Sequence, residues 1–267
     1  MTWDPAQYER FADHRDRPFH ELTARVRAEA PAHVVDLGCG PGPLTASLAA
    51  RWPGARVEGL DSSPEMIREA LARHASSPDL ASGRLGFALA DAASWIPDED
   101  VDVLVSNAML QWIPDHARLV ERWLDALRPG AWFAAQVPGN FGAPSHALMR
   151  RLASSPRWDP VLGSVLRADP VGEPADYVRL LVDAGFEADV WETGYQQLLP
   201  GADPVLEWVR GTGLRPVLAR LDARQTEEFE AEYAALLRDA YPPRTAPDGT
   251  TYTVFPFRRI FFTGRKR

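Results

Sequence analysis

The sequence predicts an α/β fold in which a mostly parallel sheet is covered by helices. Short apolar runs alternate with amphipathic stretches along the 267 residues, as in strands that are joined through helices. The β-branched run at 33–37 is followed at once by three closely spaced glycines, which is typical of a buried parallel strand that turns sharply into a helix. The last apolar run, 254–263, predicts an antiparallel strand that completes the sheet.

Turn and capping residues divide the chain into elements. Ser63, Pro64 and Glu65 indicate a helix start, because they supply a cap, a favourable first position and a negative charge at the positive end. Pro129 and Gly130 end a helix and turn the chain toward the next strand. Seven strands are expected, at 33–37, 56–60, 84–89, 101–106, 131–137, 185–191 and 254–263. Helices are expected within 4–28 and at 43–51, 64–74, 115–127, 143–155, 174–184, 203–210, 214–221 and 224–240.

We interpret residues 1–267 as one domain with a helical cap. Its parts are an N-terminal helical lid at 1–30, a core at 31–138 and a helical insertion at 200–245. The insertion precedes the last strand, so we expect it over the carboxyl ends of the earlier strands, where ligands of open α/β sheets bind.

Charge, composition and sequence pattern argue against several classes of partner and cellular location. A net charge of −8 disfavours nucleic acid, which needs a basic face. No apolar run approaches the roughly 20 residues that span a bilayer, and the start of the chain lacks a secretory signal pattern. Cys39 is the single cysteine, which fits a reducing cytoplasm. No His, Cys or Asp cluster has metal-ligand spacing, so we expect no metal.

The glycine run and the acid that follows it predict a nucleoside site. Gly38, Gly40 and Gly42 give G-x-G-x-G, and Asp61 ends the next predicted strand about 20 residues on, where a carboxylate can bind ribose hydroxyls. Pro43 replaces the third glycine of a dinucleotide fingerprint, which argues against NAD. The alternatives are a tight turn without ligand and, for Asp61, a plain helix cap.

The run from Asp36 to Gly42 resembles motif I of the class I S-adenosylmethionine-dependent methyltransferases. The chain further resembles the trans-aconitate 2-methyltransferase family in segments 3–8, 11–18, 61–66, 106–112, 144–146, 207–216 and 255–259. Departures from that pattern are Pro43-Leu44 after the glycines, and Gly139 and Ala143 after the fifth strand; the latter two bear on substrate choice. The resemblance implies a Rossmann-like class I methyltransferase fold. It also implies S-adenosylmethionine as cofactor, S-adenosylhomocysteine as product, and methylation of a small polycarboxylic acid, most directly trans-aconitate to its monomethyl ester.

The resemblance also assigns cofactor residues. The loop backbone would lie along the methionine part with Asp36 facing its ammonium, Asp91 and Ala92 would meet the adenine, and Asn107 and Ala108 would lie near the transferred methyl. A simple turn is the alternative for Asp91. The full predicted set is Tyr8 and Arg15 in the lid, Asp36, Gly38, Cys39, Gly40, Gly42, Asp61, Ser62, Met66, Asp91, Ala92, Asn107 and Ala108.

A second predicted set would bind the anionic acceptor. Arginine suits it, because its rigid fork pairs with both oxygens of a carboxylate. Adjacent Arg258 and Arg259 must point to opposite faces of a strand. Trp112 as ordinary packing and His146 as a simple hydrogen-bonded residue are the alternatives. The set is Gln111, Trp112, Asn140, His146, Tyr195, Trp208, Arg210, Arg258 and Arg259.

The predicted chemistry needs no catalytic base, since a carboxylic acid with a pKa of about 4 is already ionised at neutral pH. Two alternatives stay open. One is a methyltransferase for another acceptor, such as a natural-product or lipid acid, a hydroxyl or an amine, with His146 or His116 as base for a hydroxyl. The other is a non-catalytic nucleoside-binding module. We expect a cytoplasmic monomer or weak homodimer.

Overall fold

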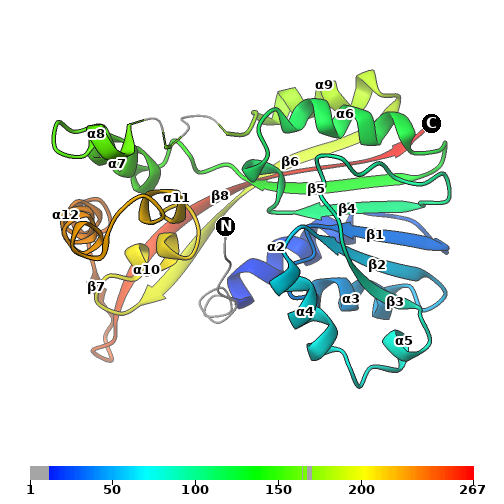
Figure 1. Ribbon diagram of the computed structural model, residues 1–267, viewed down its shortest axis with the longest axis horizontal. Coiled ribbons are helices and arrows are strands. Elements are labelled where there is room, and N and C mark those ends of the chain that lie inside the picture. The colour runs from blue at the N-terminus through cyan, green and yellow to red at the C-terminus, as the bar shows by residue number, and fades with distance from the viewer. Residues whose placement is uncertain (1–11, 164, 167–169) are drawn as a thin grey trace. The chain divides into compact units, whose positions relative to one another are not determined.

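The computed structural model describes residues 12–163, 165–166 and 170–267 (Figure 1). The chain divides into two compact units. The first, here called the sheet unit, comprises Met1–Val137, Val171–Glu192 and Ile260–Arg267. The second, here called the helical unit, comprises Pro138–Pro170 and Thr193–Arg259.

A mixed sheet organises the described residues, with strands in the order β3-β2-β1-β4-β5-β8-β6 and a short β7 paired with β8. The pairs among β1 to β5 are parallel. β8 runs antiparallel to β5, because the Lys266 N–H donates to the carbonyl of Ala131 while the Gly139 N–H donates to that of Arg258. This confirms the predicted fold class. The strands are β1 (His33–Leu37), β2 (Arg56–Asp61), β3 (Leu85–Leu89), β4 (Val103–Asn107), β5 (Trp132–Pro138), β6 (Phe186–Pro200), β7 (Arg244–Thr245) and β8 (Thr251–Lys266).

The predicted helices are present with nearly the expected bounds. The Ser63 hydroxyl caps α4 by accepting from the Met66 N–H at 3.3 Å, and Pro64 occupies its first turn, as expected. Three short helices, α5, α8 and the 3-10 helix η1, were not predicted. The helices are α2 (Ala12–Ala24), α3 (Pro43–Arg51), α4 (Pro64–Arg73), α5 (Pro78–Ala81), η1 (Leu110–Trp112), α6 (His116–Ala126), α7 (Pro144–Ala153), α8 (Asp159–Leu162), α9 (Pro174–Asp183), α10 (Pro204–Arg210), α11 (Arg215–Leu218) and α12 (Ala223–Ala240).

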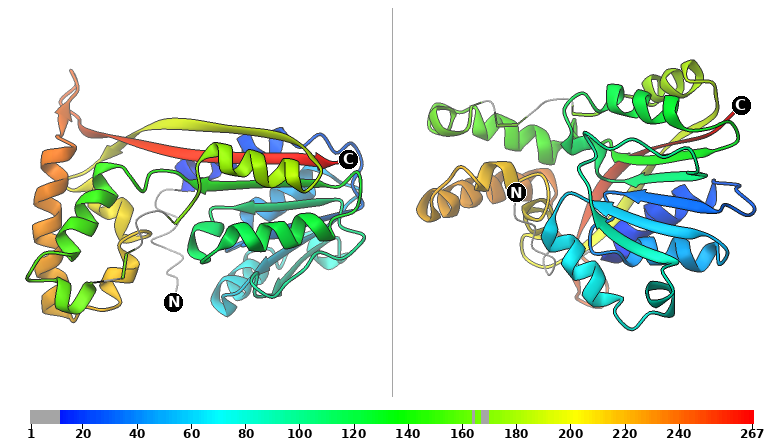
Figure 2. Two further views of the ribbon diagram at one scale, coloured as in Figure 1. Left: turned by 90° about the horizontal axis from the view of Figure 1, so that it is seen from above. Right: turned by 45° about the vertical axis from the view of Figure 1, so that its right-hand side comes forward.

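Helices cover both faces of the sheet unit. α6 and α9 lie on one face, and α2 and α3 lie on the other (Figures 1 and 2). The alternation of β8 follows this division: Phe262 stacks on Tyr177 of α9 with ring centroids 4.1 Å apart, whereas its neighbour Phe261 stacks on Trp191. Successive strand residues thus serve opposite faces.

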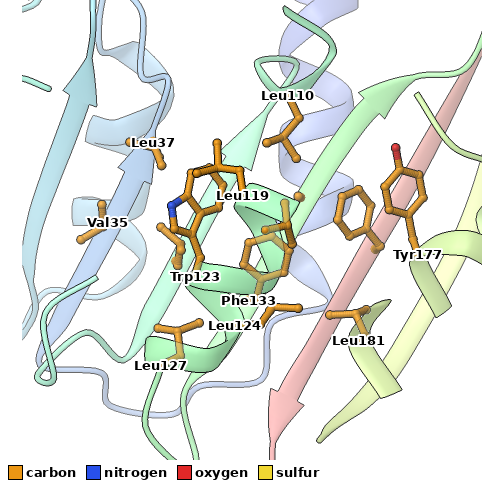
Figure 3. Packing of buried hydrophobic residues seen from close by; sticks show 14 of the residues in the cluster. Val35, Leu37, Leu110, Leu119, Trp123, Leu124, Leu127, Phe133, Tyr177 and Leu181 are labelled. Atoms are coloured by element: carbon orange, nitrogen blue, oxygen red, sulfur yellow. The ribbon is translucent and has the colours of Figure 1, made fainter. Parts of the chain in front are cut away.

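The core beneath α6 fixes the strands that carry the site (Figure 3). Trp123 is completely buried among Leu119, Leu124 and Phe133, and its indole N–H donates to the carbonyl of Trp95. Burial of such large apolar side chains stabilises each by about 1.5–3 kcal/mol. The carboxyl ends of the strands are therefore held on a rigid layer.

The helical unit has its own core. Trp208 of α10 packs edge-on against Phe255 of β8, while the Tyr233 hydroxyl donates to the carbonyl of Ser145 at 2.7 Å and so ties α12 to α7. The helices expected for the substrate cap correspond to α10, α11 and α12. None of the described helices combines the length and apolarity needed to cross a bilayer.

Candidate functional site

The sheet unit contains a cleft of about 360 Å³ at the carboxyl ends of β1, β2 and β4. Open α/β sheets bind ligands at this edge, and the volume falls within the range of small-molecule sites. The cleft brings together nine of the predicted cofactor residues with the predicted acceptor residue Trp112. Its lining is Leu37, Gly38, Gly40, Pro41, Leu60, Asp61, Ser62, Met66, Ala90, Asp91, Ala92, Asn107, Ala108, Met109, Trp112 and Ile113.

The glycine loop after β1 forms one wall. Gly38 has φ 85°, and a Cβ built on it would lie 2.6 Å from Cγ of Met109, so both conformation and space require glycine. A Cβ on Gly40 would meet nothing within 4 Å. A ligand can therefore approach the backbone closely at Gly40.

Asp61 braces this loop. One carboxylate oxygen accepts the Gly40 N–H and the other accepts the Ser63 N–H, each at 2.9 Å. The helix cap itself is Ser63; Asp61 holds the backbone of that cap residue and also lines the cleft. A carboxylate has about four acceptor positions, so two remain for ligand hydroxyls.

Asp91 combines a turn with a place in the cleft. Its carboxylate accepts the Ala93 N–H at 2.9 Å, the simple turn given as the alternative. The residue is exposed and lines the cleft beside Ala92. The turn therefore fixes the carboxylate at the rim without consuming all of its acceptor capacity.

Three predicted residues of the glycine run do not line the cleft. Asp36 is 2% exposed, and one of its oxygens accepts the Thr45 hydroxyl at 2.6 Å. Burial raises the pKa of Asp36 to about 7, while the Thr45 hydrogen bond lowers it and the Asp61 charge raises it. Burial also raises the pKa of the Cys39 thiol, and Gly42 packs against Phe87. Asp36 lies within a wholly buried strand, so the structure pairs it with Thr45 beneath the loop.

Residues 107–113 form the other wall. Asn107, Ala108 and Trp112 line the cleft as predicted, but Gln111 does not. Gln111 is 8% exposed, and its amide donates to the carbonyl of Ala108 at 2.5 Å. The expectation that Gln111 faces the acceptor from this cleft is thus replaced by a contact with its own turn.

Six apolar residues of the lining were not predicted from the sequence. These residues stand next to predicted ones at the ends of strands, so the available signal was their position rather than their chemistry. They are Leu37, Pro41, Leu60, Ala90, Met109 and Ile113. Tyr8 lies outside the described residues, as does the side chain of Arg15.

Most of the predicted acceptor residues lie in the helical unit, where Arg210 is already paired. Its Nε and Nη2 donate to the two carboxylate oxygens of Glu230 at 2.8 and 2.9 Å, and Nη1 pairs with Glu207. The hydrogen bonds to Glu230 raise the pKa of Arg210 above its usual value. This arrangement joins α10 to α12 and pairs the charge that was expected to meet an anionic ligand with two carboxylates.

Trp208 and Tyr195 are packing residues in the helical unit. Trp208 is 2% exposed and lies between Phe255 and Phe257, and Tyr195 is 5% exposed. Large aromatic side chains commonly fill cores in this way.

His146 and Asn140 lie at the start of α7 and just before it. Burial, with a smaller contribution from the Arg150 charge, lowers the pKa of His146 to about 4, so its ring is neutral at pH 7. The Ser145 hydroxyl lies 3.2 Å from His146 Nδ1. Asn140 is 3% exposed, and neither of its amide atoms has a hydrogen-bond partner within the described part of the chain. Such a buried amide is costly unless a ligand or water satisfies it.

Arg258 and Arg259 differ in exposure and in the groups they contact, as the alternation of side chains along a strand predicts. Arg258 is partly exposed and donates to the carbonyl of Gly139 at 3.3 Å. Arg259 is 5% exposed, with its guanidinium 4.7 Å above the ring of Phe257. Among residues 12–163, 165–166 and 170–267, no three His, Cys, Asp or Glu side chains are grouped so as to hold a metal ion.

Comparisons with known proteins identify the family of the chain. Residues 34–130 match the model of a family described as "Methyltransferase domain". The chain is 53% identical to the trans-aconitate 2-methyltransferase of Streptomyces avermitilis, over 99% of this chain and 97% of that protein. It is 54% identical to the Rhodococcus jostii protein of the same name, over 97% of each.

Solved structures show the same fold at low sequence identity. YcgJ of Bacillus subtilis is 14% identical with a TM-score of 0.58, covering 94% of this chain and 98% of that one. Phosphoethanolamine N-methyltransferase 2 of Haemonchus contortus, solved with S-adenosyl-L-methionine, is 17% identical with a TM-score of 0.55, covering 94% of this chain and 52% of that one.

Proposed function

Since the chain belongs to the trans-aconitate 2-methyltransferase family, we propose that it transfers the methyl group of S-adenosylmethionine to a carboxylate oxygen of trans-aconitate. The product would be a monomethyl ester, with S-adenosylhomocysteine released. The observation that carries this proposal is the cleft in which the glycine loop, Asp61 and Asp91 come together in a chain that matches its relatives end to end.

The lining of the cleft fits an adenosine cofactor. Gly40 leaves open space above the loop, and Asp61 retains acceptor positions for ribose hydroxyls. Asp91 would accept from the adenine amino group, and Met66 and Ile113 would pack against the base. When bound, S-adenosylmethionine supplies a methyl group on a positively charged sulfur.

The chain's part in the reaction is alignment. The acceptor carboxylate is ionised at neutral pH, because its pKa is about 4, so no side chain has to remove a proton. We therefore assign no catalytic base. Holding the reacting oxygen and the methyl carbon in line can supply on the order of 7–11 kcal/mol of the barrier reduction.

We propose that the acid is recognised by Asn140 and by one of the two adjacent arginines, Arg258 or Arg259, since these point to opposite faces of their strand. The buried amide of Asn140 has both a donor and an acceptor to offer, and an arginine fork matches a carboxylate. Arg210 is left out of this set, because Glu230 and Glu207 already take its donors.

An alcohol acceptor finds less support. An effective general base has a pKa near the operating pH, whereas burial lowers the pKa of His146 to about 4. The other candidate base, His116, is buried against the Tyr177 hydroxyl. Neither histidine is suited to deprotonate a hydroxyl.

Release of S-adenosylhomocysteine against a panel of acids, alcohols and amines tests the proposal. We expect the highest kcat/KM with trans-aconitate and a steep fall for monocarboxylic acids of equal size. Faster turnover of a neutral alcohol than of any polycarboxylate would contradict the acceptor, and no turnover with bound cofactor would favour a nucleoside-binding module.

Action as a cytoplasmic monomer or weak homodimer, on a free small molecule and without metal or nucleic acid, belongs to the same proposal. The net charge of −8 and the single cysteine support it.

A further inference from the structure

The second wall of the cleft contains a strained backbone position. Ala108, directly after β4, has φ 53°. Alanine seldom adopts this left-handed conformation, because its Cβ crowds the following carbonyl oxygen. Such a residue persists only where its surroundings hold it, commonly at a functional site.

Two hydrogen bonds hold Ala108. Its N–H donates to the backbone carbonyl of Gln136 on β5 at 2.9 Å, which continues the pairing of β4 with β5. Its carbonyl accepts from the side-chain amide of Gln111 at 2.5 Å. Only the second bond comes from a side chain, so only that bond can be removed by substitution.

The turn at Ala108 sets the positions of its neighbours. Met109 packs so closely on the glycine loop that a Cβ on Gly38 would lie 2.6 Å from its Cγ. Asn107 lines the cleft while its side-chain oxygen is buried without a hydrogen-bond partner in the described ranges. A change of backbone conformation at Ala108 would therefore shift both residues.

We propose that Gln111 is a positioning residue of the cofactor cleft. By donating to the Ala108 carbonyl, it holds the left-handed turn that seats the 107–109 wall against the glycine loop. It acts through Ala108, since Gln111 itself is buried and absent from the lining. This inference rests on the proposed function only in taking S-adenosylhomocysteine as the ligand to measure.

The test first replaces the side-chain amide of Gln111 and then, in a second variant, relieves the backbone strain at Ala108 that this amide is proposed to hold. Gln111→Met keeps the side-chain volume but loses the amide, and we expect about a tenfold weaker Kd for S-adenosylhomocysteine by calorimetry. Adding Ala108→Gly should restore the Kd to within about threefold of wild type, because glycine adopts positive φ without a Cβ penalty. Gln197→Met is the matched control: Gln197 is equally buried, at 6% exposure, but lies in the helical unit, and its Kd should not change.

An unchanged Kd in Gln111→Met, or failure of Ala108→Gly to restore it, would overturn the proposal, since a merely structural glutamine would not be rescued by a glycine three residues away. Hydrogen exchange over 107–113 gives a reading that needs no ligand: exchange should be faster in Gln111→Met than in wild type or Gln197→Met. Absence of S-adenosylhomocysteine binding by the wild type would instead count against the proposed function, and the exchange measurement would still decide the role of Gln111.

Discussion

The cleft of the sheet unit and the charged residues of the helical unit satisfy their polar groups in different ways. In the cleft, Asp61 is held by two backbone N–H groups, which leaves part of its acceptor capacity open. In the helical unit, Arg210 is held by two carboxylates, which neutralise it. Backbone hydrogen bonds orient a charged group and leave its net charge in place, whereas an oppositely charged side chain neutralises it.

The difference distinguishes charged groups that keep hydrogen-bonding capacity from charged groups that are neutralised. Asp61 and Asp91 line the cleft and accept backbone N–H groups, so acceptor positions remain on both carboxylates. In the helical unit the corresponding group is the buried amide of Asn140, because its polar atoms have no partner in the part of the chain that the structure describes.

The largest effect we expect comes from Asp36, a buried carboxylate that accepts a hydrogen bond from the neutral hydroxyl of Thr45. Its folded-state pKa of about 7 exceeds the ordinary 3.8, so the folded state binds the proton more tightly than the unfolded state. Its contribution to stability is fully present below about pH 3.8 and is lost as pH rises to about 7. The loss is on the order of 4 kcal/mol.

Asp36→Asn should abolish that loss, because the amide keeps an acceptor for Thr45 but carries no charge. The measurement is the free energy of unfolding in urea at pH 5 and pH 8, as the difference between wild type and variant. At pH 8 the free energy of unfolding should be larger for Asp36→Asn than for wild type. If this advantage of the variant were smaller at pH 8 than at pH 5, the assignment of the raised pKa to Asp36 would be contradicted.

The next effect concerns cofactor binding. Asp61→Ala removes the brace on Gly40 and the carboxylate that we propose to bind the ribose hydroxyls, so we expect S-adenosylhomocysteine to bind about 100-fold more weakly, or about 2.7 kcal/mol. Asp98→Ala, at an exposed aspartate outside the cleft, is the control in the same calorimetric titration. An unchanged Kd in Asp61→Ala would refute the ribose assignment.

Acceptor recognition gives a somewhat smaller effect. Asn140→Leu removes both polar atoms at similar volume, and we expect kcat/KM for trans-aconitate to fall about 30-fold, or about 2 kcal/mol. The Kd for S-adenosylhomocysteine should stay the same, because Asn140 does not line the cleft. If kcat/KM for trans-aconitate and for a monocarboxylic acid fell equally, Asn140 would have no part in recognising the additional carboxylates.

Local signals predicted the fold and nine of the residues that line the cleft. The helix expected at 43–51 is found at Pro43–Arg51, because Gly42 and Pro43 fix its start. The strand expected at 185–191 continues to Pro200. From Gly194 onward exposed residues alternate with buried ones, but Leu198 is among the exposed residues, so hydrophobicity alone did not reveal this part of the strand.

The contacts of several predicted site residues could not be predicted from the sequence, because they depend on tertiary packing. Glu230 meets Arg210 only because α10 packs against α12, and no local pattern indicates that pairing. The inward contact of Gln111 depends on a left-handed alanine at position 108, which propensities do not predict. Asp36 was expected at the ligand, but its strand is buried along its whole length.

The smallest effect we expect concerns the ion pair between Arg210 and Glu230, and it tests whether the charge of Arg210 serves stability alone. Arg210→Met keeps the aliphatic packing but leaves Glu230 without its bidentate partner, and it should lower the free energy of unfolding by about 1–2 kcal/mol. Glu230→Gln and the double variant complete a cycle whose coupling energy measures the pair directly. The ratio of kcat/KM for trans-aconitate to that for a monocarboxylic acid should match wild type, because the charge of Arg210 is already neutralised. A loss of that ratio in Arg210→Met without a loss in Glu230→Gln would show that Arg210 leaves its carboxylates to bind the acid, and the contrast between the two units would then fail at this residue.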